Sequence, residues 1–189
     1  MKSRLKTAAA IFALLWSLAS IPGLLSPAFA FTVEEVKPLL RKDYYPAVLD
    51  LIRNAERSIY LVMYGIQLRD RDENDLVHNL LRGLIEADRR GARVTVILQT
   101  GQDDSWGEYV TRINREVKQL LRSEGIRVYL DDDQTTTHAK LLVVDEEITV
   151  LGSHNWTFAA FMRNNESSVL IRSRPLARQY IRYFQSIRR

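Results

Sequence analysis

Short, mainly apolar runs alternate along this chain with longer segments in which apolar residues recur every three or four positions. The runs over 58–64 and 94–98 are apolar on both faces and predict strands covered on both sides, and 126–130 predicts a further strand. The periodic segments predict amphipathic helices over 45–55, over 72–90 and from Tyr109 to Gly125. Gly91 and Gly125 follow two of these helices and are typical helix terminators.

The last third of the chain predicts a hairpin, a strand and a final helix. Residues 139–144 and 148–151 form the hairpin, which turns around 145–147, and 168–171 form the strand. Ser173 and Pro175 open the last helix. This order predicts an α/β fold in which a mixed β-sheet is sandwiched between helices that cover both of its faces. The order of the strands within the sheet does not follow from the pattern.

The first thirty residues have the organisation of an export signal. A basic start precedes an apolar run over 8–19 and a break at Pro22, and Ala28 and Ala30 are the small residues that signal peptidase requires. We therefore expect a signal peptide over 1–30 that is cleaved after Ala30. The product would be a single exported domain over 31–189, periplasmic or secreted, with no stable membrane span. The alternative is an uncleaved anchor, since 7–25 is barely long enough to cross a bilayer.

Removing the signal changes the charge of the protein. The chain has 27 Lys and Arg against 23 Asp and Glu, and the first thirty residues hold three of the bases and no acid, which leaves 24 against 23. Net charge therefore gives little support for nucleic-acid binding, although seven arginines from Arg163 onward accompany a single acid, Glu166. Cysteine is absent, so there is no disulfide partner, and stability depends on the core or on a second copy of the chain.

The hairpin begins with the segment HAKLLVVD, His138 to Asp145. On a strand, His138 and Lys140 project from the same face about 6.6 Å apart. Lysine is rarely buried without an anion to meet it, so the pair predicts an anion-binding pocket, the alternative being that both lie at an exposed strand start. Asp145 is about 23 Å from His138 along a straight strand and cannot orient it. We assign Asp145 a structural role at the turn, holding the return strand in register through nearby backbone N–H groups.

The return strand ends in GSHNW, which begins at Gly152. It brings Ser153 and Asn155 back toward the end of the hairpin that carries His138. Glu166 opens the next strand and could arrive at the same end, where it could accept a hydrogen bond from Nδ1–H of His138 and leave Nε2 free as a nucleophile.

These motifs resemble those of the phospholipase D superfamily, whose signature H-x-K-x4-D fits HAKLLVVD and whose G-S-x-N segment and trailing acid fit GSHNWTFAAFMRNNE. The active-site motif region is 132–166, and the chain resembles small, exported, single-motif members such as bacterial phospholipase D-like endonucleases. The resemblance implies cleavage of phosphodiesters through a covalent phosphohistidine, without metal or other cofactor. By position it implies His138 as nucleophile, Lys140 and Asn155 as ligands of the phosphoryl oxygens, Ser153 assisting them, Glu166 orienting His138, and Asp145 and Gly152 as structural motif residues.

One histidine is not sufficient for this chemistry, because the leaving alkoxide also needs a proton. The other histidines, His78 and His154, have no lysine two positions later. We interpret His78 as a solvated surface residue and His154 as a packing residue. Single-motif relatives form homodimers with a shared active site, and the resemblance implies a second His138 that acts as acid and base. A metal site built from His138 and Asp145 is disfavoured, because the two are far apart and Lys140 would repel the cation.

The substrate has three interpretations. A nuclease has a slight advantage, because the short loops leave no evident lipid-binding insertion. The alternative is a phospholipase D that hydrolyses or transphosphatidylates phospholipids such as phosphatidylcholine, and the third is a non-catalytic module that binds phosphate or nucleic acid. Trp106 is expected to pack at a helix start, although it follows a strand end where substrate loops often lie. The acidic run 131–133 is interpreted as a solvated loop.

Overall fold

The computed structural model describes 31–69, 75–100, 105–131 and 135–187, which belong to a compact unit spanning Phe31–Arg189. The predicted signal peptide over 1–30, the predicted helix start at 72–74 and the acidic residues at 132–133 lie outside the described residues. Along the part of the chain that is described, no helix combines the length and the apolarity needed to cross a bilayer.

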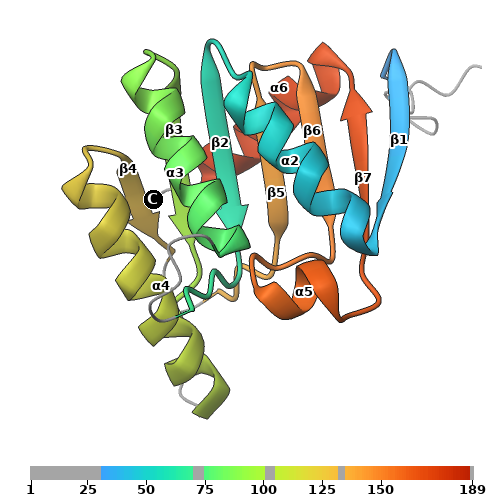
Figure 1. Ribbon diagram of the computed structural model, residues 1–189. Helices are drawn as coiled ribbons and strands as arrows, with labels where there is room; N and C mark the ends of the chain where they lie inside the picture. Colours follow the sequence, from blue (N-terminus) through green and yellow to red (C-terminus); the bar gives the residue numbers. More distant parts are fainter. Residues whose placement is uncertain (1–30, 70–74, 101–104, 132–134, 188–189) are drawn as a thin grey trace, which may run out of the picture. The chain divides into compact units, whose positions relative to one another are not determined.

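Seven strands of the described residues form one sheet, and its mixed character agrees with the prediction (Figure 1). Their order across the sheet is β1-β7-β6-β5-β2-β3-β4. The strands β2, β3 and β4 pair in parallel, and every other neighbouring pair is antiparallel. Their bounds are β1 Glu35–Leu40, β2 Ser58–Met63, β3 Arg93–Leu98, β4 Arg127–Leu130, β5 Lys140–Val144, β6 Ile148–Gly152 and β7 Ser167–Arg172.

Helices cover both faces of the sheet, which confirms the predicted α/β sandwich. On one face lie α2 Tyr44–Arg53, α3 Leu76–Arg89 and α4 Ser105–Ser123, and on the other lies α6 Arg174–Ile187 (Figure 1). Two separate clusters of buried side chains fill the spaces between the sheet and these two layers. The central strand β2 is buried at all six positions, which is why its sequence is apolar on both faces.

Three elements were not predicted from the pattern. The edge strand β1 is exposed at five of its six positions and contains Pro38, which pairs with Val169 of β7. A strand with one neighbour tolerates proline, and it needs no apolar alternation when both faces are open. The short helix α5 Phe158–Met162 follows β6, and the 3-10 helix η1 Arg41–Asp43 precedes α2. Neither is long enough to show a periodicity.

Two local features correct or refine the predicted bounds. The helix predicted over 72–90 begins at Leu76, because Asp75 is its N-cap and accepts a hydrogen bond from the Val77 N–H at 3.2 Å. The hairpin between β5 and β6 turns through Asp145 and Glu146, both with positive φ, 55° and 58°. Positive φ at both central residues is the requirement of the tight hairpin turn that matches the twist of the strands.

Candidate active site

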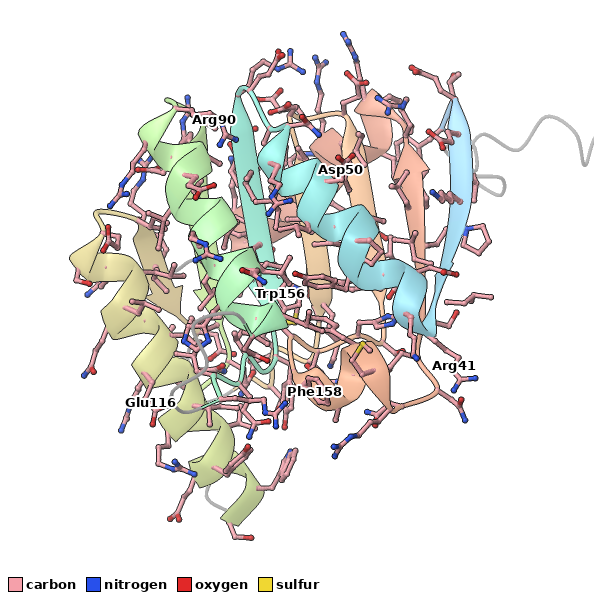
Figure 2. The ribbon with its side chains drawn as sticks, in the orientation of Figure 1. Arg41, Asp50, Arg90, Glu116, Trp156 and Phe158 are labelled. Carbon is pink, nitrogen blue, oxygen red and sulfur yellow. The ribbon has the colours of Figure 1, made fainter. Side chains whose placement is uncertain are left out.

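The lower edge of the sheet in Figure 1 gathers the predicted site residues, because β6 ends there and β5 and β7 begin there. His138 lies two residues before β5, and Lys140 is its first residue. Glu166 immediately precedes β7. The remaining residues, at or just after the end of β6, are Gly152, Ser153 and Asn155. Figure 2 shows Trp156 and Phe158 near the same edge, which places the whole GSHNW segment beside the ends of the strands.

Tyr64, which follows β2, contacts both His138 and Lys140. The rings of Tyr64 and His138 meet edge to face with centroids 4.5 Å apart, and Nζ of Lys140 lies 4.7 Å from the centre of the Tyr64 ring. The same Nζ donates a hydrogen bond to the backbone oxygen of His138 at 2.7 Å. His138 is exposed, whereas Lys140 is only 8% exposed, so the alternative that both side chains lie at an exposed strand start is wrong for Lys140.

The electrostatics of this pair follow from burial. Burial lowers the pKa of Lys140 to about 8, although the negative charge of Glu166 acts in the opposite direction. Burial, and then the positive charge of Lys140, lower the pKa of His138 below its ordinary value of 6.5. At neutral pH His138 is therefore predominantly a neutral imidazole and Lys140 predominantly an ammonium. A nucleophilic nitrogen thus stands beside a fixed positive charge.

Glu166 does not form the predicted hydrogen bond with His138. Its carboxylate accepts hydrogen bonds from Oγ of Ser153 and, at 3.0 Å, from Nδ2 of Asn164. The reason is topological, because β6 lies between β7 and β5 and two strand spacings separate their backbones by roughly 9.6 Å. Glu166 acts on the His138 end of the site through its charge, as the pKa of Lys140 shows.

Gly152 is required by the close approach of β6 and β7. A Cβ at this position would lie 2.2 Å from Oγ of Ser168, 2.4 Å from its Cα and 2.5 Å from the backbone oxygen of Ser167. This approach aligns Ser153, whose N–H donates to the Ser167 oxygen at 3.0 Å and whose Oγ accepts from the Ser167 N–H at 3.0 Å. The predicted motif glycine therefore positions the serine that holds Glu166.

Asn155 contributes a buried polar atom with no partner. Its Oδ1 has no hydrogen bond among the described residues, and a Cβ added to Gly65 would lie 3.8 Å from it. An unpaired buried polar atom costs about 1–3 kcal/mol, and such atoms are concentrated where a ligand completes the structure. Oδ1 is an acceptor and needs a donor, so a bound anion would instead be met by the Nδ2 N–H groups at the other side of the same amide.

Several residues that support this edge were missed by the sequence analysis. Asn114 of α4 is fully buried, donates from Nδ2 to the backbone oxygens of Tyr64 at 2.8 Å and Gln99 at 2.9 Å, and accepts from the Ile66 N–H. A polar residue within the apolar stripe of a helix was the available signal. Asp131 accepts hydrogen bonds from Thr100, at 2.5 Å from its N–H, and from the Thr137 N–H at 3.3 Å. The prediction of a solvated loop is therefore wrong for Asp131, which anchors the segment before His138.

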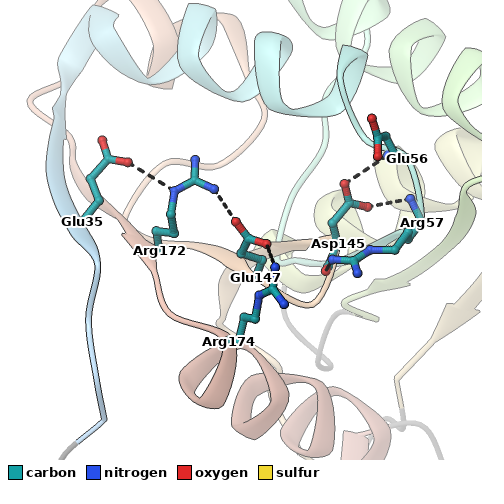
Figure 3. A network of polar contacts seen from close by, with 7 residues as sticks. All are labelled: Glu35, Glu56, Arg57, Asp145, Glu147, Arg172 and Arg174. Atoms are coloured by element: carbon teal, nitrogen blue, oxygen red, sulfur yellow. Dashed lines mark hydrogen bonds and ion pairs between the residues drawn. The ribbon is translucent and has the colours of Figure 1, made fainter.

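Asp145 lies at the opposite end of the sheet, and its predicted partners were wrong (Figure 3). Its carboxylate accepts from the backbone N–H groups of Glu56 at 3.0 Å, Arg57 at 2.7 Å and Ser58 at 2.9 Å. These residues form the connection into β2, 87–89 positions earlier in the chain, rather than the return strand. The motif aspartate therefore ties the hairpin to the neighbouring central strand.

The two other histidines lie away from His138. His154 is fully buried, stacks on Tyr44 at 4.2 Å, and contacts Oγ of Ser168 at 2.7 Å and the Arg41 oxygen at 3.0 Å. Burial lowers the pKa of His154, and the predicted packing role agrees with this position. His78 is half-buried on α3 with Nδ1 3.9 Å from Asp75, so the prediction of a solvated residue is wrong. Among the described residues, no three His, Asp or Glu side chains gather as a metal site.

The sequence of this chain is similar to those of several known proteins. The family described as cardiolipin synthase, phospholipase D-like domain, matches residues 48–188. Phospholipase D of Rickettsia prowazekii (strain Madrid E) is 28% identical over 136 residues, which are 71% of this chain and 57% of that protein. Mitochondrial cardiolipin hydrolase of Mus musculus is 31% identical over 99 residues, which are 52% of this chain and 41% of that protein. The matches therefore cover only about half of these curated relatives.

Two solved structures share the fold. Nuc, a phospholipase D family member from Salmonella typhimurium, has a TM-score of 0.65 and 23% identity, over 81% of this chain and 94% of that chain. NucT from Helicobacter pylori has a TM-score of 0.59 and 20% identity, over 81% of this chain and 96% of that chain.

Proposed function

The chain belongs to the phospholipase D-like family, and we propose that it cleaves phosphodiester bonds through a covalent intermediate on His138, without a metal ion. The observation that carries the proposal is the pairing of an exposed, neutral imidazole with the largely desolvated ammonium of Lys140. Lys140 and Asn155 would bind the non-bridging oxygens of the phosphate and stabilise the charge that develops on them. Ser153 would hold Glu166, whose negative charge keeps Lys140 protonated.

The reaction has two displacements at phosphorus. Nε2 of His138 attacks the phosphorus, a P–N bond forms, and the P–O bond to the leaving alcohol breaks while that oxygen takes a proton from a general acid. Water then gives a proton to the same group, now a base, and attacks the phosphorus, so that the P–N bond breaks and a phosphomonoester is released. Both steps require a proton-transfer group on the side of the phosphate opposite His138.

The partner copy's His138 is the group that we propose for this proton transfer. The chain contains three histidines, and the other two are held at α3 and beneath η1, away from the phosphate site. A homodimer with its twofold axis at the lower edge of the sheet would bring two His138 side chains to one phosphate. The active site would then be shared equally by the two chains.

We propose a nucleic acid as the substrate. Two arginines, Arg69 and Arg163, lie over the ring of Phe158 at the catalytic edge, with guanidinium carbons 4.4 and 5.3 Å from its centre. Neither forms an ion pair with a carboxylate among the described residues, so both are available to backbone phosphates. The names of the curated relatives favour a second candidate, hydrolysis of phospholipids such as phosphatidylcholine or cardiolipin. We also propose that the chain is exported, on the basis of 1–30.

Hydrolysis of bis(p-nitrophenyl) phosphate in excess EDTA tests the chemistry. We expect activity that survives chelation, falls by at least about 10⁴-fold in His138→Ala, and persists in the matched control His78→Ala. Acid quenching during turnover should trap phosphate on His138. Activity lost on chelation, or retained in His138→Ala, would contradict the proposal.

Subunit mixing tests the shared site. A hybrid of one His138→Ala chain with one unaltered chain should lose most of its activity, because each phosphate needs both histidines. A hybrid that keeps half of the activity would show two independent sites. Parallel assays with single-stranded DNA, RNA, and vesicles of phosphatidylcholine and cardiolipin then separate the two candidate substrates.

A further inference from the structure

A row of aromatic side chains leads from His138 onto α4. The ring of Tyr64, which meets the His138 ring, carries a phenol that accepts a hydrogen bond from Nε1 of Trp106 at 3.0 Å. Trp106 stacks against Tyr109, with centroids 5.4 Å apart and planes inclined by 29°. The guanidinium of Arg112 lies 5.3 Å from the centre of the Tyr109 ring. A single aromatic side chain therefore separates the nucleophile from the indole.

The fold does not need Trp106 in this position. The buried face of α4 is formed by Gly107, Val110, Ile113, Asn114, Val117 and Leu121. Trp106 is 60% exposed, so the prediction that it packs at the helix start is wrong. Figure 1 shows the first turns of α4 extending beyond the lower edge of the sheet, and the hydrogen bond from Trp106 joins this end of the helix to Tyr64 after β2. The hydrogen bond to Tyr64 fixes the indole edge and leaves ring surface open to solvent.

We propose that Trp106, Tyr109 and Arg112 form a base-binding subsite for single-stranded nucleic acid. A base next to the phosphate at His138 would stack on Trp106, and Arg112 would meet a phosphate further along the strand. This inference rests on the proposed function and adds to it a strand preference. Bases stacked in a duplex present only their edges, so the subsite would favour unpaired nucleotides.

The mixture of aromatic and charged side chains along this row favours nucleic acid over lipid. Arg112 and Arg115 are both exposed on the turns of α4 that follow Trp106. Nη1 of Arg112 lies 3.8 Å from the Glu116 carboxylate, and both side chains of this pair are exposed, so a phosphate can compete for Arg112. A lipid chain would need a continuous apolar surface, whereas a strand of nucleic acid needs aromatic faces for its bases and cations for its phosphates.

Binding measurements with two matched oligomers test the subsite. One is a labelled single-stranded oligothymidylate, and the other is an oligomer of abasic residues with the same phosphates and no bases. Trp106→Ala should weaken binding of oligothymidylate by about tenfold or more, as expected for the loss of one stacked base, and should leave binding of the abasic oligomer unchanged. Trp106→Phe should retain most of the affinity. Arg112→Ala should weaken both oligomers equally, more than the matched control Arg115→Ala.

Four results would overturn the inference. Equal losses on both oligomers in Trp106→Ala would show an indirect effect through Tyr64, and unchanged binding of both would show that no base stacks there. Loss of the dimer in Trp106→Ala, judged by sedimentation, would assign the indole to a second copy of the chain. Phosphatidylcholine vesicles that bind through Trp106 while oligothymidylate does not would assign it to a membrane.

The assay separates this inference from the proposed function, because binding is measured in the His138→Ala background as well as in the unaltered protein. Base-dependent binding without any cleavage would contradict the proposed function and support the subsite. Cleavage of oligothymidylate with base-independent binding would support the proposed function and overturn the subsite.

Discussion

Both ends of the β5–β6 hairpin carry charged and polar side chains, but these side chains have partners at the turn and lack some of them at the other end. At the turn, the carboxylate of Asp145 accepts three backbone hydrogen bonds, and Glu147 pairs with Arg172 and with Arg174 at 3.0 Å (Figure 3). At the other end, Lys140 has no carboxylate partner among the described residues, and Oδ1 of Asn155 has no hydrogen bond.

This difference separates stability from function. Polar groups that satisfy one another lower the free energy of the folded state, whereas polar groups left without partners raise it and remain available to a ligand. The turn end therefore stabilises the hairpin on which the other end is built. If this is correct, substitutions at the two ends should have opposite effects on activity and on stability.

The largest effect is expected for Lys140→Met. Methionine keeps an aliphatic stem against Tyr64 but removes the charge, so kcat should fall by about 10²–10³, as on removal of one donor to a developing anion. The melting temperature should stay unchanged or rise, because the desolvated ammonium is no longer buried. Steady-state kinetics and thermal unfolding of the same preparation measure both quantities. A large loss of stability would show that Lys140 is structural.

Asp145→Ala should have the reverse effect. It leaves the N–H groups of Glu56, Arg57 and Ser58 without their acceptor, and we expect a loss of about 1–3 kcal/mol in the free energy of unfolding. Activity per folded molecule should change little, because the substitution is at the opposite end of the sheet. Urea unfolding, with bis(p-nitrophenyl) phosphate hydrolysis in the absence of urea, makes the comparison. A loss of activity without a loss of stability would contradict the proposed difference between the two ends of the hairpin.

The pH dependence of activity should reflect the protonation of His138 and Lys140 at the end of the hairpin that lacks ion pairs. The leaving group of bis(p-nitrophenyl) phosphate is acidic and needs little protonation by the second His138, so kcat/KM should follow the nucleophile. It should rise as that His138 loses its proton below pH 6.5 and fall near pH 8 as Lys140 loses its proton. Because Glu166 raises the pKa of Lys140, Glu166→Gln should move the alkaline limb to lower pH. The acid limb serves as the internal reference. If the alkaline limb does not move, Glu166 does not affect the pKa of Lys140.

The smallest effect is expected for Glu147→Gln. Its partners Arg172 and Arg174 are partly exposed, so the free energy of unfolding should fall by less than about 1 kcal/mol, and by less still in high salt. The arginines lower the pKa of Glu147 below 4.5, so this contribution is present above pH 4.5 and is lost as acidification passes through the lowered pKa. Thermal unfolding of Glu147→Gln and the unaltered protein between pH 3 and 7 measures it. An effect as large as that of Asp145→Ala would contradict the ranking.

Residues with an unambiguous local pattern could be located without the structure. The strand β2 is apolar on both faces because both faces are covered, and α3 and α4 carry an apolar stripe because only one face is covered. The position of His138, Lys140, Ser153 and Asn155 at one end of the hairpin followed from strand geometry alone. The edge strand β1 could not be found in this way, because its pairing with β7 depends on a strand more than 120 residues later.

The α/β fold, the position of the hairpin and the chemical groups at its two ends follow from local pattern, because alternation and spacing act over a few residues. Which groups meet across strands depends on the folded arrangement. It separated Glu166 from His138 by the width of β6, paired Asp145 with the connection into β2, and placed Tyr64 beside the imidazole and Trp106 against Tyr64. These contacts join segments far apart in the chain, so their partners depend on strand order, which no local pattern of residues encodes.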